Sequence, residues 1–267
     1  MRPRLQVGAA STQGTCREAN GDVVFVSDAL AVYAVLDGRA SNDEAVTLAF
    51  TQLSAAAESG EPIERALYRA DGAIREKFRA HCAEVTRKRL TVRAKFNRAI
   101  HWVFQRSLVR ELEYPTCDYV QVSSISFDAL RRSATVTHIG GSSVYRLRDT
   151  LEAITEQVSM VNVHAHGEAA FPEECLQSLR RGIFRRGLGA ESEQVIDVRS
   201  VDVHPGDVYL LCTDGVPAGT LLGSSDCADL LRSESNSARA ARKVLDLADA
   251  HLDGSDDATA LVIRVEP

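Results

Sequence analysis

Apolar residues follow two kinds of pattern along this chain of 267 residues. Short alternating or continuous apolar runs, which are typical of β-strands, occur at about residues 5–10, 22–27, 31–36, 119–127, 133–139, 143–148, 194–202, 207–213 and 258–265. Helical spacing of apolar positions occurs at about residues 41–58, 62–82, 87–112, 173–181, 225–232 and 236–251. This order predicts an α+β fold in which antiparallel sheets carry helices on their outer faces.

Local signals at the ends of these elements agree with that architecture. Gly60 ends the first predicted helix and Pro62 starts the next, which is the usual placement of these two residue types. Turn residues at 128–133 lie between two predicted strands and predict a β-hairpin. Because no repeat or Ser/Gly-rich linker interrupts the sequence, we expect a single domain over residues 1–267.

The composition is that of a globular protein and argues against nucleic-acid and membrane binding. Hydrophobic residues make up 45% and charged residues 25% of the chain, as in ordinary globular proteins, and the formal charge of −6 argues against a nucleic-acid-binding role. The six cysteines show neither zinc nor redox-motif spacing, which fits a reducing compartment. No apolar run has the length of a signal peptide or a membrane span. We therefore expect a cytoplasmic protein that binds neither membrane nor nucleic acid.

Four aspartates stand at the ends of predicted strands. Asp37 and Asp214 each end an apolar run and are followed by glycine, whereas Asp22 and Asp256 each come just before a strand. A single aspartate in such a place is more often a turn residue than a ligand. As a set, however, these carboxylates have the chemistry of a site for two hard divalent cations.

A series of segments between residues 17 and 259 matches the motifs of one enzyme family in type and order. They are Arg17-x-x-Asn20-x-Asp22, Asp37-Gly38, and residues 140–145 (GGSSVY), 154–159 (ITEQVS), 206–215 (GDVYLLCTDG) and 254–259 (GSDDAT). Together they resemble the metal-dependent protein phosphatases of type 2C, the bacterial-type serine/threonine phosphatases. The resemblance implies a four-layer αββα sandwich of two antiparallel β-sheets flanked by helices.

The resemblance also implies a mechanism and a role for each matching residue. Asp37 would bridge two Mg²⁺ or Mn²⁺ ions, and the Gly38 carbonyl would bind one of them. Asp214 and Asp256 would hold one ion, and Asp22 would orient water in the shell of an ion. A cation-activated water would then attack the phosphorus. The Arg17 guanidinium would bind the phosphoryl group, so the catalytic residues would be Arg17, Asp22 and Asp37.

Several positions depart from the family's pattern. Gly141 replaces an aspartate that helps to hold a third cation in the family, so we expect that third site to be absent. Arg39 places a cation beside the metal site, and Gly21 replaces an acidic or amide residue. The remaining departures are Ser143, Gln157, Val158, Asp257 and, in place of a G-T-T turn, the segment Val122-Ser123-Ser124. The four carboxylates nearest the cation pair remain.

Two further segments are prominent in the sequence. Residues 86–110 contain eight basic and no acidic residues, within a basic helical segment expected at about residues 85–112. This is a solvated face of a packed helix or a docking helix for an acidic or phosphorylated partner. Nucleic-acid binding is a third interpretation, for which one basic helix is weak evidence. His164 and His166 lie in a flap-like segment expected at about residues 160–192, where histidines are more often solvated than metal-bound.

The sequence therefore predicts a cytoplasmic signalling enzyme, a Mg²⁺/Mn²⁺-dependent serine/threonine phosphatase that hydrolyses phosphate monoesters with two cations. Its partners would be phosphorylated proteins, including a serine/threonine kinase or the targets of that kinase. The alternative is a catalytically weak or silent relative that binds a phosphoprotein or kinase through the same cleft. The retained aspartates favour the enzyme, whereas Gly21, Arg39 and Gly141 favour the silent relative.

Overall fold

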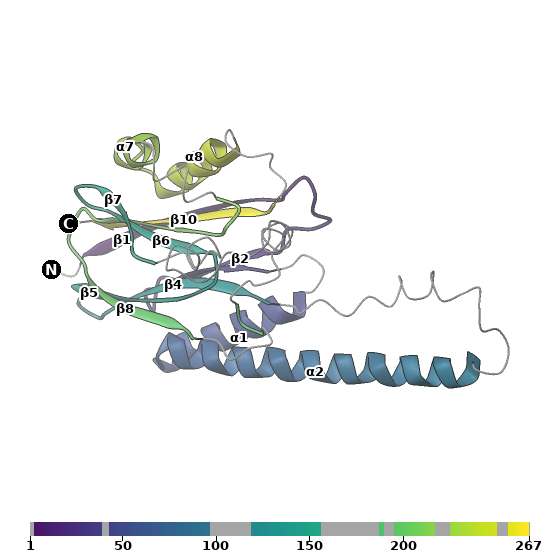
Figure 1. Cartoon of the computed structure of the whole chain (residues 1–267). Helices are drawn as coiled ribbons and strands as arrows, with labels where there is room; N and C mark the ends of the chain where they lie inside the picture. Colours follow the sequence, from purple (N-terminus) through teal and green to yellow (C-terminus); the bar gives the residue numbers. More distant parts are fainter. Residues whose placement is uncertain are drawn as a thin grey trace, which may run out of the picture.

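Two five-stranded antiparallel sheets form the centre of the protein (Figure 1). The computed structural model describes residues 3–38, 43–96, 119–155, 187–189, 195–216, 225–249 and 256–266. One sheet has the order β2-β3-β4-β5-β8, with strands Asp22–Ser27, Val32–Asp37, Gln121–Phe127, Ser133–Ile139 and Asp197–Asp202. The other has the order β1-β10-β9-β6-β7, with strands Arg4–Thr12, Ala258–Glu266, Val208–Cys212, Ser143–Leu147 and Leu151–Ala153.

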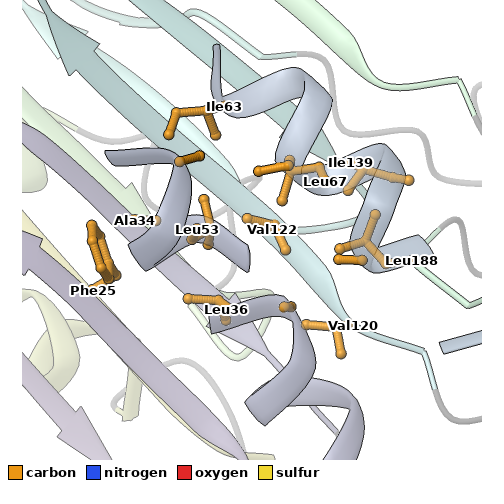
Figure 2. Close-up of a cluster of buried hydrophobic side chains, with 14 of the residues drawn as sticks. Phe25, Ala34, Leu36, Leu53, Ile63, Leu67, Val120, Val122, Ile139 and Leu188 are labelled. Carbon is orange, nitrogen blue, oxygen red and sulfur yellow. The ribbon is translucent and has the colours of Figure 1, made fainter. Parts of the chain in front are cut away.

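Helices cover the outer face of each sheet (Figure 1). Helices α1 (Asp43–Ser59) and α2 (Ile63–Phe96) pack on the sheet that contains β3. Helices α7 (Ser225–Ser233) and α8 (Ser237–Asp249) pack on the sheet that contains β9. Figure 2 shows the first of these interfaces, where Ala34 and Leu36 of β3 face Leu53 and Leu67 of the two helices.

The alternation of side chains along β3 explains why both faces of this strand are buried. Ala34 and Leu36 point to the helices, whereas Tyr33 and Val35 point to the opposite sheet, where Tyr209 of β9 is among their neighbours. Successive residues of a strand face opposite sides, so one strand contributes to two core layers. The resulting order of helices, sheet, sheet and helices confirms the predicted αββα sandwich.

The observed elements follow the sequence prediction with a few differences. The hairpin at 128–133 is confirmed, since the Asp128 N–H donates to the Ser133 carbonyl over 3.0 Å. The short strand β7 is not predicted by the pattern. The sequence predicts separate helices at 62–82 and 87–112. Over the described residues this prediction is wrong, because α2 runs as one continuous helix of 34 residues from Ile63 to Phe96. Residues 83–86 contain neither proline nor glycine, so nothing breaks the helix there.

Some predicted features lie outside the described residues. These are the helix at 173–181, most of the flap-like segment, Arg39, Gln157, Val158, the two histidines at 164 and 166, and the basic segment beyond Phe96. Within the described part of the chain, no helix combines the length and apolar character that a membrane crossing requires.

Candidate metal centre

Strand pairing brings the first two aspartates together at one end of a sheet. Asp22 opens β2 and Asp37 ends β3, and the antiparallel register places them directly opposite each other. Asp214 follows β9 of the facing sheet, and the Gln121 amide nitrogen donates to both Asp37 Oδ2 (2.8 Å) and Asp214 Oδ2 (2.9 Å). Carboxylates from both sheets therefore meet at the same end of the sandwich.

Asp22 is tied to the facing sheet through a hydroxyl group. Thr213 Oγ1, next to Asp214, donates to Asp22 Oδ2 over 2.7 Å and accepts from the Thr259 N–H over 2.9 Å. Asp22 Oδ1 is buried and has no hydrogen-bond partner among the described residues. A buried carboxylate oxygen without a partner is costly, and a cation or an ordered water is the usual solution.

Burial is the main cause of the unusual pKa values in this cluster. It raises the pKa of Asp22 to about 7, an effect that hydrogen bonds from Thr213 and Thr259 partly oppose. It also raises the pKa of Asp37 well above its usual range, and the nearby charges of Asp214 and Asp22 add to the shift. Negative charge is therefore poorly compensated here by the protein, and a dication is the species that such a site favours.

This arrangement predicts a pH dependence of stability in the metal-free protein. The pKa of Asp22 is about 7 when folded but about 3.8 when exposed, so the folded state binds more protons between these values. Stability gained from the protonated carboxyl is complete below about pH 4 and is lost as the pH rises towards 7. Urea unfolding in EDTA from pH 4 to pH 7 should show this loss. Asp22→Asn should flatten the profile, and an unchanged slope in this variant would contradict the assignment.

Arg17 and Asp256 are also brought to this end of the sandwich, where they bind each other. The Arg17 Nε donates to Asp256 Oδ1 over 2.9 Å, and a second guanidinium nitrogen of Arg17 contacts the same oxygen. Both side chains are partly exposed, at 28% and 33%. Arg17 thus lies at the rim of the cluster, within reach of solvent.

Asp257 fixes the loop that carries Arg17, a role that the sequence did not predict. Its two carboxylate oxygens accept the N–H groups of Gly14 and Gly21, each over 2.8 Å. An aspartate can accept at both oxygens, whereas an asparagine offers only one acceptor. In the sequence, the one sign that Asp257 belongs to the site is its position beside Asp256, just before the last strand.

The glycines beside the aspartates are required by close packing. A Cβ on Gly38 would overlap the Val46 side chain, and one on Gly215 would overlap the carbonyl oxygen of Asp257. By contrast, a Cβ on Gly72, inside α2, would meet nothing within 4 Å.

A matched pair of substitutions tests this steric role. Gly215→Ala should lower the free energy of unfolding by roughly 1–3 kcal/mol, because the added methyl group meets backbone. Gly72→Ala, in an open helical position, should raise it by roughly 0.4–1 kcal/mol. Urea titrations of both variants would check the contrast, and equal effects would contradict it.

The geometry as a whole shows which predicted residues converge. Arg17, Asp22, Asp37, Asp214 and Asp256 share one cluster, in which the charges of Asp214, Asp22 and Asp256 all act on Asp37. Among the described residues, however, no three acidic, histidine or cysteine side chains are arranged as a ready cation shell.

The donor set nevertheless fits a hard divalent cation. The converging groups are carboxylates, with the buried Asp22 Oδ1 still lacking a partner among the described residues, and oxygen donors are those that Mg²⁺ and Mn²⁺ prefer. The segment Val122-Ser123-Ser124 is not part of the site. These residues lie inside β4 rather than in a turn; Val122 packs against the helices, and Ser123 Oγ contacts His138 Nδ1 at 3.0 Å.

Comparison with known proteins places the chain in a family. The sequence profile described as Stage II sporulation protein E (SpoIIE) matches residues 45–266. The serine/threonine phosphatase stp of Listeria welshimeri is 26% identical over 130 residues, which are 48% of this chain and 50% of that protein. The chain thus spans about half the length of the curated relatives it matches.

Solved structures share the fold over nearly the whole chain. The serine/threonine phosphatase PstP/Ppp of Mycobacterium tuberculosis has a TM-score of 0.66 and 23% identity, covering 98% of this chain and 99% of that one. The catalytic domain of PstP in complex with two manganese ions has a TM-score of 0.67 and 22% identity, with the same coverage. The chain belongs to the SpoIIE family, which confirms its resemblance to the bacterial phosphatases of type 2C.

Proposed function

We propose that this protein is a Mg²⁺- or Mn²⁺-dependent serine/threonine phosphoprotein phosphatase that acts in cytoplasmic signalling. Its substrates would be phosphorylated proteins, including a kinase or the targets of that kinase. The family membership and the likeness to a phosphatase solved with two manganese ions support this proposal.

The observation that carries the proposal is the cluster of poorly compensated carboxylates. Asp37 and Asp214 lie close enough to share one amide donor, and Asp22 Oδ1 has no partner in the described part of the chain. We assign the cations to Asp37, the Gly38 carbonyl, Asp214 and Asp256, with Asp22 alongside. When bound, two divalent cations would lower the pKa of a water and neutralise the charge of the phosphoryl group.

The protein's own groups would bind and orient the substrate. Arg17, at the exposed rim, would donate two parallel hydrogen bonds to phosphoryl oxygens, a geometry that guanidinium provides and ammonium does not. Asp22 Oδ1 would accept a hydrogen bond from the attacking water and so orient it. Asp257 would keep the Arg17 loop in place through its bonds to Gly14 and Gly21.

We propose two cations rather than three. Gly141 offers no side chain at the position where the family pattern has a third-site carboxylate, and its N–H is already bonded to the Gln121 amide oxygen. Fewer oxygen donors weaken the binding of a hard cation. The expected enzyme is therefore a slow one.

A catalytically silent relative is the second candidate, and one observation favours it. The Gln121 amide bridges Asp37 and Asp214, which are the carboxylates that a cation would need. Such a protein would bind a phosphoprotein or kinase without hydrolysing it.

Hydrolysis of an aryl phosphate and of phosphothreonine peptides, with EDTA, Mg²⁺ or Mn²⁺, separates the two candidates. The enzyme should release phosphate only with a divalent cation, and EDTA should remove the activity. No release with any cation, together with retained binding of a phosphopeptide, would favour the silent relative.

A further inference from the structure

Gln121 is the central polar side chain of the cluster, although it carries no charge. It stands at the start of β4, and the register of β3 and β4 places it directly opposite Asp37. Its side chain is buried, with only 2% of the residue exposed. The group at the meeting point of the two sheets is therefore an amide.

Both ends of this amide are held. The nitrogen donates to Asp37 Oδ2 and Asp214 Oδ2, which uses both of its hydrogens. The oxygen accepts the N–H of Gly141. These three bonds fix the orientation of the amide, because reversing it would set its oxygen against two carboxylates and its nitrogen against an N–H.

We propose that the Gln121 amide occupies the position between Asp37 and Asp214 that a divalent cation would take, and that a cation must displace it. Gln121 is thus a positioning residue that sets the cation affinity of the centre. The inference rests on the cation site of the proposed function. It extends that function by making cation binding a competition with a side chain of the protein itself.

The Gln121 amide and a divalent cation would compete for the same two carboxylates. The amide N–H groups offer the carboxylates positive partial charge in the absence of metal, so the two acids are held together without a counterion. A dication offers two full charges but must break both amide bonds first. The amide therefore raises the cation concentration at which the site fills.

Gly141 is the structural partner of Gln121 in this arrangement. A Cβ on Gly141 would lie 2.6 Å from Gln121 Oε1 and 3.3 Å from both Cβ and Oδ2 of Asp214. Gly141 is not among the glycines with positive φ, so space rather than backbone conformation requires glycine here. A methyl group at this position should push the amide out of its bridging place.

Calorimetric titration of the EDTA-treated protein with Mn²⁺ tests the proposal without any assay of activity. Gln121→Ala removes the competing donors, and Gln121→Met keeps the length of the side chain but neither donates nor adds a charge. Both should bind Mn²⁺ about tenfold more tightly than the wild type, in the range that residues supporting a metal site typically control. Gln52→Ala is the matched control, since the amide oxygen of Gln52 accepts from Arg69 Nε, outside this cluster.

A double-mutant cycle of Gln121 and Gly141, read out as Mn²⁺ affinity, tests the competition more specifically. Gly141→Ala should tighten Mn²⁺ binding in the wild-type background but have little effect in Gln121→Ala, because the amide it displaces is already gone. Near-UV circular dichroism of each metal-free variant would confirm that it is folded. If Gln121→Ala does not fold, Gln121→Met and Gly141→Ala still test the competition.

Each outcome decides the inference separately from the proposed function. Tighter Mn²⁺ binding in the Gln121 variants supports it, even if none of them hydrolyses phosphate and the proposed function fails. Unchanged affinity would overturn it. Weaker affinity would also overturn it, since Gln121 would then be a ligand. Absence of Mn²⁺ binding in the wild type and all variants would overturn it as well.

Discussion

Asp37→Asn and Asp214→Asn are each expected to abolish Mn²⁺-dependent phosphate release, with kcat falling by on the order of 10²–10³-fold or more. Each change removes one formal negative charge from the carboxylates that would hold the cations. Asparagine is close to aspartate in size, and it can still accept the amide proton that Gln121 donates to each carboxylate. The loss should therefore be one of cation binding rather than of folding.

The metal-free stability of the Asp37 variant gives an independent check. Burial and the charges of Asp214 and Asp22 hold the pKa of Asp37 well above its usual range. A neutral asparagine avoids the free-energy cost of burying an ionised carboxylate near Asp214 and Asp22. Asp37→Asn should therefore unfold at a higher urea concentration than the wild type in EDTA at pH 8. Asp229→Asn on α7 removes an exposed ion pair with Arg232. This control is expected to change neither phosphate release nor the urea concentration at which the protein unfolds. Wild-type turnover in either cluster variant would refute the cation assignment.

Arg17→Ala is expected to raise KM for phosphopeptides by roughly ten- to a hundredfold, the worth of a charge-assisted hydrogen bond of about 1.5–3 kcal/mol. The guanidinium is partly exposed at the rim and does not itself offer an oxygen to a cation. Mn²⁺ affinity, measured by calorimetry, should therefore be kept or increased, because Asp256 loses its bond to Arg17.

Arg17→Lys separates charge from geometry in the same experiment. Lysine keeps the positive charge but loses the planar pair of donors, so it should recover only part of the lost affinity. Kinetics on peptide and aryl phosphates that match the wild type in both variants would show that Arg17 does not contact the phosphoryl group.

The layered fold was predictable because its cause is local. Strands such as β3 and β9 are short continuous apolar runs, as expected for strands buried on both faces, and Gly60 and Pro62 mark the boundary between α1 and α2. The continuity of α2 was less predictable, since the helical spacing of apolar residues is interrupted between about residues 82 and 87.

The site was only half predictable, because part of it depends on pairing between distant segments. Asp22, Asp37, Asp214 and Asp256 are visible as aspartates at strand ends. Gln121 is visible only once β3 and β4 are in register, since 84 residues separate it from Asp37. In the sequence, Asp257 is only a departure from the family pattern, because its role depends on two bonds to the loop that carries Arg17.

The bond between Arg17 and Asp256 has a thermodynamic consequence for the order of binding events. A cation that recruits Asp256 would release the guanidinium for an anion, so each ligand would increase the affinity of the other. Such linkage is reciprocal, and the factor must be the same in both directions. Phosphate would then be a heterotropic effector of Mn²⁺ uptake, and the centre would fill with cation and anion together rather than one after the other.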